Sequence, residues 1–219
     1  MFNVKKKWKY FVIVKRSGKG KEYNNYGKLE FEGEYLNGSR NGKGKEYSGG
    51  KLVFEGEYLN GKRWNGKGKE YDYKGKLEFE GEYLNGERNG KGKEYWDGTL
   101  KFECEYLNGK RNGKGIKYYI NGQLKFEGTY LLGLKYKGIG YDKYGELSFE
   151  GEYLNGERNG KGKEYFNKAI IFEGEYLNNK RWKGTKYDIY GKVKYNLNND
   201  IIEFEHWTKW HFPISLLLQ

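Results

Sequence analysis

One pentapeptide, Phe-Glu-Gly-Glu-Tyr, recurs along the chain at nearly constant spacing. It begins at Phe31, and related copies follow in steps of 23 to 25 residues, at Phe54, Phe79, Phe102, Phe126, Phe149 and Phe172. A period of this size is typical of one supersecondary unit stacked many times, each copy burying its apolar face against its neighbours. The sequence therefore predicts a repeat array with a long surface, not a globular domain around a catalytic cleft.

Each copy shows the pattern of two short strands. Residues 29–35 alternate apolar or small residues with glutamate, which is typical of a strand with one buried face. Asn37-Gly38 then marks a hairpin turn, and residues 42–47 form the second strand. The lysines of this second strand are expected to face the glutamates of the first.

The aromatic residue at the end of the second strand breaks this simple alternation. Strict alternation places Tyr47 on the charged side with Lys43 and Lys45. We expect a β-bulge near Glu46 that returns the tyrosine ring to the core.

The residues that follow the pentapeptide carry a resemblance to a known family. The run Phe-Glu-Gly-Glu-Tyr-Leu-Asn-Gly-Glu-Arg-Asn-Gly-Lys-Gly, from Phe79 to Gly92, resembles the MORN repeat, in which an aromatic-x-Gly-x-aromatic strand leads to Asn-Gly and then Gly-x-Gly. The likeness covers about seven full copies and a half copy, from about Gly18 to Tyr195. It implies an all-β fold, an elongated, twisted, single-layer array of antiparallel β-hairpins. The resemblance also implies a scaffold or assembly role, and members of the family are credited with phospholipid binding and self-association.

The pattern divides the chain into three segments. Residues 1–17 are expected to form a basic N-terminal segment with a capping strand, residues 18–195 the repeat array, and residues 196–219 a C-terminal capping strand with an apolar tail. The two capping strands are predicted at Trp8–Val14 and Ile201–Trp207.

Charge and cysteine usage restrict the function class. The net charge is +12, but the first 21 residues hold eight basic residues and no acidic one, so the repeats carry mixed charge. Nucleic acid is therefore not expected as a partner. Cys104 is the only cysteine and replaces an inward glycine, so it is expected to be a small buried hydrophobic residue. With no signal-peptide pattern recognised, we expect a cytoplasmic protein, with a position at the membrane periphery as an alternative.

No residues suited to catalysis or metal binding are brought together by the repeat. The only histidines are His206 and His211, near the end of the chain. The repeated glutamates face lysines and are interpreted as a solvated ladder. We therefore expect a protein that is not an enzyme and has no metal or cofactor.

Arginine occupies one repeated position after the Asn-Gly turn. Six of the seven arginines stand there, Arg40, Arg63, Arg88, Arg111, Arg158 and Arg181, and Lys135 fills the remaining copy. Each guanidinium could stack on a neighbouring ring or bond loop carbonyls, or the row could present cations to a partner. Three copies place an aromatic residue directly after the cation, giving Arg63-Trp64, Lys135-Tyr136 and Arg181-Trp182. Our hypothesis is that this edge docks a protein, although these rings could instead fold over adjacent hairpins.

The predicted function is a non-enzymatic repeat scaffold for protein–protein interaction or assembly, with an unknown partner. Exposed terminal strands would also favour a homodimer. The first alternative is a peripheral membrane tether that binds anionic phospholipids through Lys5, Lys6, Lys7, Lys9, Lys15 and Arg16. The second alternative is an extracellular binder of glycans or cell walls.

Overall fold

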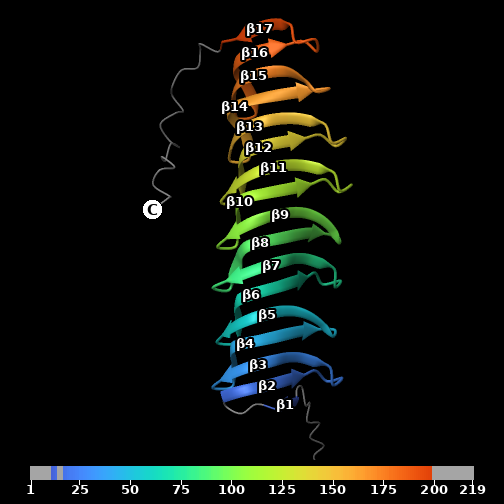
Figure 1. The fold of residues 1–219 in the computed structure, drawn as a ribbon, viewed down its shortest axis with the longest axis vertical. Coiled ribbons are helices and arrows are strands. Elements are labelled where there is room, and N and C mark those ends of the chain that lie inside the picture. Colours follow the sequence, from blue (N-terminus) through green and yellow to red (C-terminus); the bar gives the residue numbers. More distant parts are fainter. Residues whose placement is uncertain (1–10, 14–16, 199–219) are drawn as a thin grey trace, which may run out of the picture.

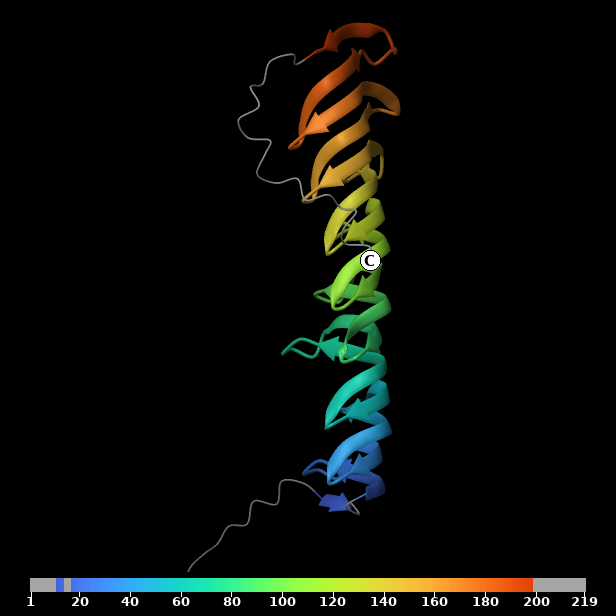
Figure 2. The ribbon, with the colours of Figure 1, turned by 90° about the vertical axis from the view of Figure 1, so that its left-hand side faces the viewer.

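The fold is a narrow rod made from one open β-sheet. The computed structural model describes residues 11–13 and 17–198 of the chain. Seventeen antiparallel strands follow one another in sequence order, each paired with the strand before and after it (Figure 1). A view turned by 90° shows the strands twisting about the long axis (Figure 2). No described residue lies in a helix, and the predicted all-β array of hairpins is confirmed.

The strands have the following bounds: β1 Phe11–Ile13, β2 Ser17–Tyr23, β3 Leu29–Leu36, β4 Ser39–Ser48, β5 Lys51–Leu59, β6 Lys62–Tyr71, β7 Leu77–Leu84, β8 Glu87–Trp96, β9 Thr99–Leu107, β10 Lys110–Tyr118, β11 Leu124–Leu131, β12 Leu134–Tyr141, β13 Leu147–Leu154, β14 Glu157–Phe166, β15 Ala169–Leu177, β16 Lys180–Tyr187 and β17 Val193–Leu197.

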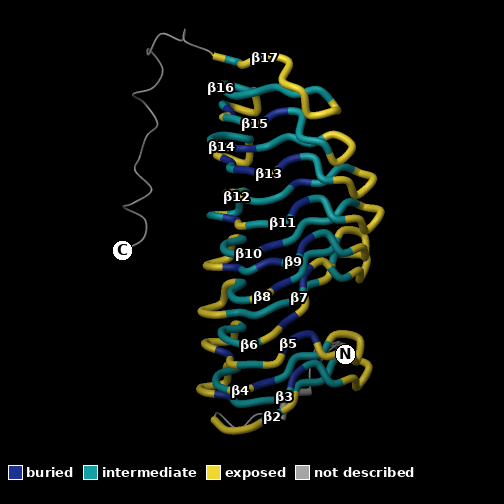
Figure 3. The backbone as a smooth tube through the Cα atoms, turned by 45° about the horizontal axis from the view of Figure 1, so that its top comes forward, coloured by how far each residue is buried: buried dark blue, intermediate teal, exposed yellow. Residues whose placement is uncertain are grey.

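Two kinds of turn form the two long edges of the rod. On one edge the predicted Asn-Gly turns have positive φ at both central residues, 51° at Asn37 and 79° at Gly38, as two-residue hairpins require. On the opposite edge several turns are held by a side chain. The Asp72 carboxylate accepts hydrogen bonds from the backbone N–H groups of Lys74 and Lys76, both at 2.8 Å. The turns are exposed, whereas the buried residues lie in the middle of the strands (Figure 3).

The core is a single row of aromatic rings on one face of the sheet. Phe31 and Phe54 are at most 1% exposed, and the Tyr58 ring lies between them, with centroid distances of 4.9 and 5.3 Å and edge-to-face geometry. The same contact between one phenylalanine and the tyrosine of the next hairpin recurs through Phe149 and Tyr176. Such ring pairs add about 0.5–1.5 kcal/mol each beyond their buried area. Neighbouring hairpins are therefore joined by shared rings as well as by backbone hydrogen bonds.

Small residues opposite the rings give them room. A Cβ atom on Gly44 would lie 2.5 Å from Cζ of Phe31, so only glycine fits there without moving the ring. Cys104 stands at the corresponding inward position of β9, opposite Gly92 and Gly115, and is 6% exposed. Burial raises the pKa of the Cys104 thiol to about 11. The prediction of a small buried hydrophobic residue is confirmed.

The bulge predicted near Glu46 is present, but the prediction that it returns the Tyr47 ring to the core is wrong. A register shift does occur between Glu46 and Tyr47, but the extra residue is Val53 on the neighbouring strand β5. Alternation in β4 therefore continues, and Tyr47 stays on the charged face, where its hydroxyl donates a 2.8 Å hydrogen bond to Glu32. Glu46 instead turns toward the aromatic face.

The other face of the sheet carries the expected ladder of opposite charges. Lys45 lies opposite Glu32 in one neighbouring strand and Glu55 in the other. The ion pair forms with Glu55, at 3.2 Å, while Lys21 pairs with Glu32 at 3.1 Å. The lysines thus link each hairpin to the next one.

The described strands reach both ends of the predicted repeat array. Strand β1, within the expected capping strand at residues 8–14, pairs with β2. Strand β17, which spans the predicted end of the array at residue 195, pairs with β16 and is the last described strand. The C-terminal strand expected at residues 201–207 and the apolar tail lie outside the described residues.

Candidate interaction surfaces

The repeated arginines point into the aromatic face and are already bonded there. The Arg88 guanidinium lies 3.9 Å from the Phe79 ring centroid, and its Nε donates to Oε1 of Glu70 at 3.1 Å. The Tyr83 hydroxyl donates to the same oxygen. The carboxylate thus binds one tyrosine and one arginine at once.

This three-residue contact recurs along the rod, and we call it the Glu–Tyr–Arg ladder. It consists of Glu22–Tyr35–Arg40, Glu46–Tyr58–Arg63, Glu70–Tyr83–Arg88, Glu94–Tyr106–Arg111 and Glu164–Tyr176–Arg181.

Electrostatics favour the charged form of three of the ladder carboxylates, Glu22, Glu70 and Glu94. Burial alone would raise the pKa of Glu94, but the hydrogen bonds from Arg111 and Tyr106 outweigh it and leave the pKa below its ordinary value. The pKa values of Glu22 and Glu70 are lowered in the same way. At neutral pH these sites are therefore ionised, paired and closed to an outside anion.

Each set of residues at the equivalent positions of one repeat is called a level of the ladder. Two levels lack the glutamate. Lys117 lies opposite Phe126 and Gly140 opposite Phe149, where Glu94 lies opposite Phe102 in the complete level. At the second of these levels Arg158 instead approaches Glu164, at 3.6 Å. The first level contains Lys135 in place of arginine and has no carboxylate partner among the described residues.

The aromatic residues beside the arginine row do not form one surface. The register pairs Tyr58 with Arg63 and Glu57 with Asn65, so Trp64 is the extra residue of a β-bulge. Its ring is half-buried and a Cβ on Gly86 of the next turn would lie 3.7 Å from it.

The two other rings of this edge are also bulge residues. Trp182 is half-buried and Tyr136 is 46% exposed. Of the three rings, Tyr136 is thus the most exposed to a partner. The basic residues Lys5, Lys6, Lys7, Lys9, Lys15 and Arg16 lie outside the described residues.

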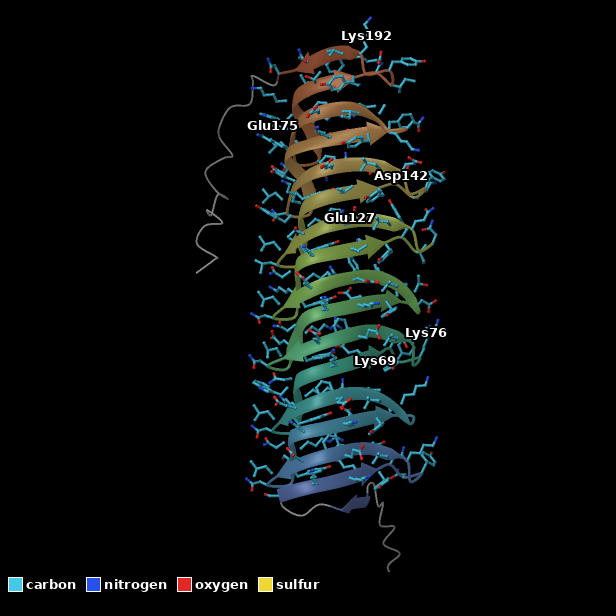
Figure 4. The ribbon with its side chains drawn as sticks, viewed as in Figure 1. Lys69, Lys76, Glu127, Asp142, Glu175 and Lys192 are labelled. Carbon is cyan, nitrogen blue, oxygen red and sulfur yellow. The ribbon has the colours of Figure 1, made fainter. Side chains whose placement is uncertain are left out.

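A second row of large side chains, which sequence reasoning missed, lines the opposite edge of the rod. Its members lie in or directly before the turns that follow β2, β6, β8, β10, β12, β14 and β16, and they are between 55% and 91% exposed. We call it the turn-tip row; it comprises Tyr26, Tyr73, Trp96, Ile120, Tyr144, Phe166 and Tyr190. Lys76, Asp142 and Lys192, from three of these turns, lie along this edge in Figure 4.

Lysines accompany the turn-tip row. The Lys101 amine lies 4.4 Å from the Trp96 ring centroid, and the Lys143 amine 5.0 Å from that of Tyr144. Between two tips, Trp96, Tyr119 and Ile120 help to line a hollow of about 160 Å³. The turn-tip row could have been recognised in the sequence from aromatic residues directly before a turn glycine, as in Tyr26-Gly27, Tyr144-Gly145 and Tyr190-Gly191.

The charged face contains a larger and shallower hollow. Its volume is about 710 Å³, and it extends from β5 to β10 between rows of lysine and glutamate over a floor of glycines. Much of its charge is internally paired, as in Lys69–Glu80 at 3.6 Å and Lys93–Glu103 at 3.5 Å.

Comparison with known families settles the repeat type. Four segments match the model of the MORN repeat, residues 31–51, 79–98, 103–124 and 149–168. The chain carries MORN repeats. Hairpins of the same kind form at the copies that begin at Phe54, Phe126 and Phe172, which lie outside the matched segments. No curated protein matches this chain in sequence.

MORN repeats are generally associated with repeat-mediated binding or scaffolding, and the family is not known as enzymatic. Within residues 11–13 and 17–198 no helix is long and apolar enough to cross a membrane. The same residues contain no group of three or more histidine, cysteine, aspartate or glutamate side chains that could hold a metal ion.

Proposed function

We propose that this MORN-repeat rod is a non-enzymatic scaffold that binds a protein partner along its turn-tip row. The observation that carries the proposal is the repeated exposure of large rings on one edge, with Tyr26, Tyr73 and Tyr190 each at least 88% exposed. Aromatic side chains are enriched at the energetic centres of protein interfaces. Rows of exposed apolar groups rimmed by polar residues commonly mark interaction sites.

The spacing of the tips supports a partner segment that lies lengthwise. From Tyr73 to Tyr190 successive tips are two strands apart, which corresponds to about 9.6 Å, whereas the turn after β4 contributes no large side chain between Tyr26 and Tyr73. An extended chain rises about 3.3 Å per residue, so along this stretch about every third residue of the partner would meet a tip. The flat rings lose little conformational entropy on binding, because each has only two rotatable side-chain bonds.

The arginine row supports this choice of edge indirectly. Five of its guanidinium groups are occupied by glutamates of the same chain in the Glu–Tyr–Arg ladder. Using them for a partner would first require breaking these internal contacts. The turn-tip row can be used without such a loss.

Affinity purification from the native cell with the full chain tests the proposal. A variant with Tyr73→Ser, Trp96→Ser and Tyr144→Ser removes three exposed rings while leaving the core unchanged. We expect it to fold as the wild type does, judged by circular dichroism, and to lose a partner that the wild type retains. Binding of the purified partner, measured by calorimetry, should weaken at least tenfold.

Two matched variants locate the binding surface. The double variant Trp64→Ala and Trp182→Ala changes the arginine-row edge, and Lys69→Ala changes the charged face. Both should keep the partner. Loss of the partner in either one, with retention in the turn-tip variant, would move the site to that surface. Vesicle binding by the purified wild type, abolished in the turn-tip variant, would instead favour a membrane role for the row.

A further inference from the structure

The level of the ladder at β10–β12 has its basic groups but lacks its acid. The register places Lys117 opposite Phe126, the position at which complete levels have glutamate. Lys135 pairs with Tyr130, as Arg111 pairs with Tyr106 one level before. Two lysines and a tyrosine therefore stand at the register positions that hold a glutamate, a tyrosine and an arginine in the complete levels.

The Tyr130 hydroxyl is the clearest sign of the missing group. Tyr130 is 3% exposed, and its hydroxyl is buried without a hydrogen-bond partner in the described part of the chain. In the complete levels this hydroxyl donates to glutamate, for example from Tyr58 to Glu46 at 3.0 Å. A buried hydroxyl without a partner costs free energy. A carboxylate at this level would remove that cost.

The two amines contact ring faces, with Lys117 4.9 Å from the Phe102 ring centroid, but neither forms an ion pair with a carboxylate in the described part of the chain. The Lys135 amine lies 4.4 Å from the Phe126 ring centroid and 5.1 Å from that of Tyr153. Burial, together with the like charges of Lys117, Lys125 and Arg158, lowers the pKa of Lys135 to about 8. The pKa of Lys117 is also lowered, mainly by burial and then by neighbouring cations. An anion placed between the amines would relieve this repulsion.

We infer that Lys117, Tyr130 and Lys135 form a binding site for a carboxylate, supplied by a glutamate or aspartate side chain of a protein partner. The inference rests on the proposed scaffold function and adds the chemistry of the bound segment. A carboxylate is favoured because five other levels hold one in the equivalent place, with tyrosine hydroxyl to glutamate distances of 2.5 to 3.2 Å. An acidic segment would insert one side chain here and complete the ladder.

The thermal midpoint of the full chain, with and without a capped hexaglutamate peptide, tests the site. Sodium chloride keeps the ionic strength equal, because salt alone also screens the two lysines. We expect the peptide to raise the midpoint of the wild type. Lys117→Glu supplies the missing acid internally, so it should raise the midpoint by about 2–4 °C without peptide, and it should abolish the peptide response.

Two further variants make the test specific. Lys62→Glu makes the same charge change at an exposed residue in another repeat, and it should keep the full peptide response. Tyr130→Phe removes only the hydroxyl and should reduce the response without changing the net charge.

Several outcomes would overturn the inference. The first is that the peptide does not shift the midpoint of the wild type. The second is that Lys62→Glu loses the peptide response as fully as Lys117→Glu does. The third is that inorganic phosphate shifts the midpoint more than the peptide does. The turn-tip variant could still bind its partner while the wild-type chain responds to the peptide. That result would contradict binding along the turn-tip row and would support the carboxylate site.

Discussion

Arg111 donates two hydrogen bonds to Glu94, from Nε to Oε1 and from Nη2 to Oε2, both at 3.0 Å. Its guanidinium also lies 4.0 Å from the Phe102 ring centroid. The planar guanidinium can make the paired bonds and the stacking contact together, whereas a lysine amine cannot. This geometry explains why arginine is kept at a repeated position in a chain that otherwise prefers lysine.

We expect Arg111→Ala to destabilise the array by about 2–3 kcal/mol, because Glu94 and Tyr106 would be left partly buried without their cation. The exposed neighbour Lys110 provides the control, and Lys110→Ala should change stability by less than about 0.5 kcal/mol. Urea denaturation measures both. Equal midpoints for the two variants would contradict a stabilising role for the ladder.

The ladder should also make stability depend on pH in the acid range. Burial opposes ionisation of Glu94, but Arg111 and Tyr106 overcome this and hold its folded-state pKa below the unfolded value near 4.3. The stabilisation is therefore present above about pH 5 and is lost as the pH falls through the lowered pKa. The stability difference between the wild type and Glu94→Gln should be largest near neutral pH and shrink toward pH 3. A difference that is constant with pH would exclude this coupling.

Two glycines that lie on strands should respond differently to alanine. Gly44→Ala would place a Cβ 2.5 Å from Phe31, so we expect a loss of about 1–3 kcal/mol as the ring is displaced. A Cβ added at Gly140 would lie 3.6 Å from its nearest neighbour, the Tyr153 hydroxyl oxygen, which is an ordinary contact. Gly140→Ala should therefore be tolerated. Thermal unfolding of the two variants gives the comparison. Similar losses in both would mean that ring clearance is not what requires glycine.

Cys104 should be unreactive in the folded chain. Burial raises its pKa to about 11, so the fraction present as the thiolate that reacts with alkylating agents is on the order of 1 in 10,000 at neutral pH. Iodoacetamide labelling followed by mass spectrometry should be slow in buffer and complete in concentrated urea. Rapid labelling of the native protein would show that the strand opens locally around this residue.

The repeat period, the hairpins and the opposed charges could be predicted from the sequence, because each depends on spacing within one copy. The partners of Arg88 could not be found in this way, since Glu70 is eighteen residues away and belongs to the preceding hairpin. Alternation in β4 did contain the needed signal, because it places Glu46 on the face of Phe54. The assumed bulge obscured it: the extra residue lies on β5, a matter of register between two strands that one copy does not specify.

The way Tyr58 contacts both Phe31 and Phe54 gives the stack a direction along the chain. Any hairpin can receive the ring of its successor and offer its own ring to its predecessor, so an additional copy could be inserted without new kinds of contact. Each insertion would lengthen the rod by about 9.6 Å. Gene duplication could therefore adjust the reach of such a protein in fixed steps, as a molecular ruler whose divisions are the shared aromatic rings.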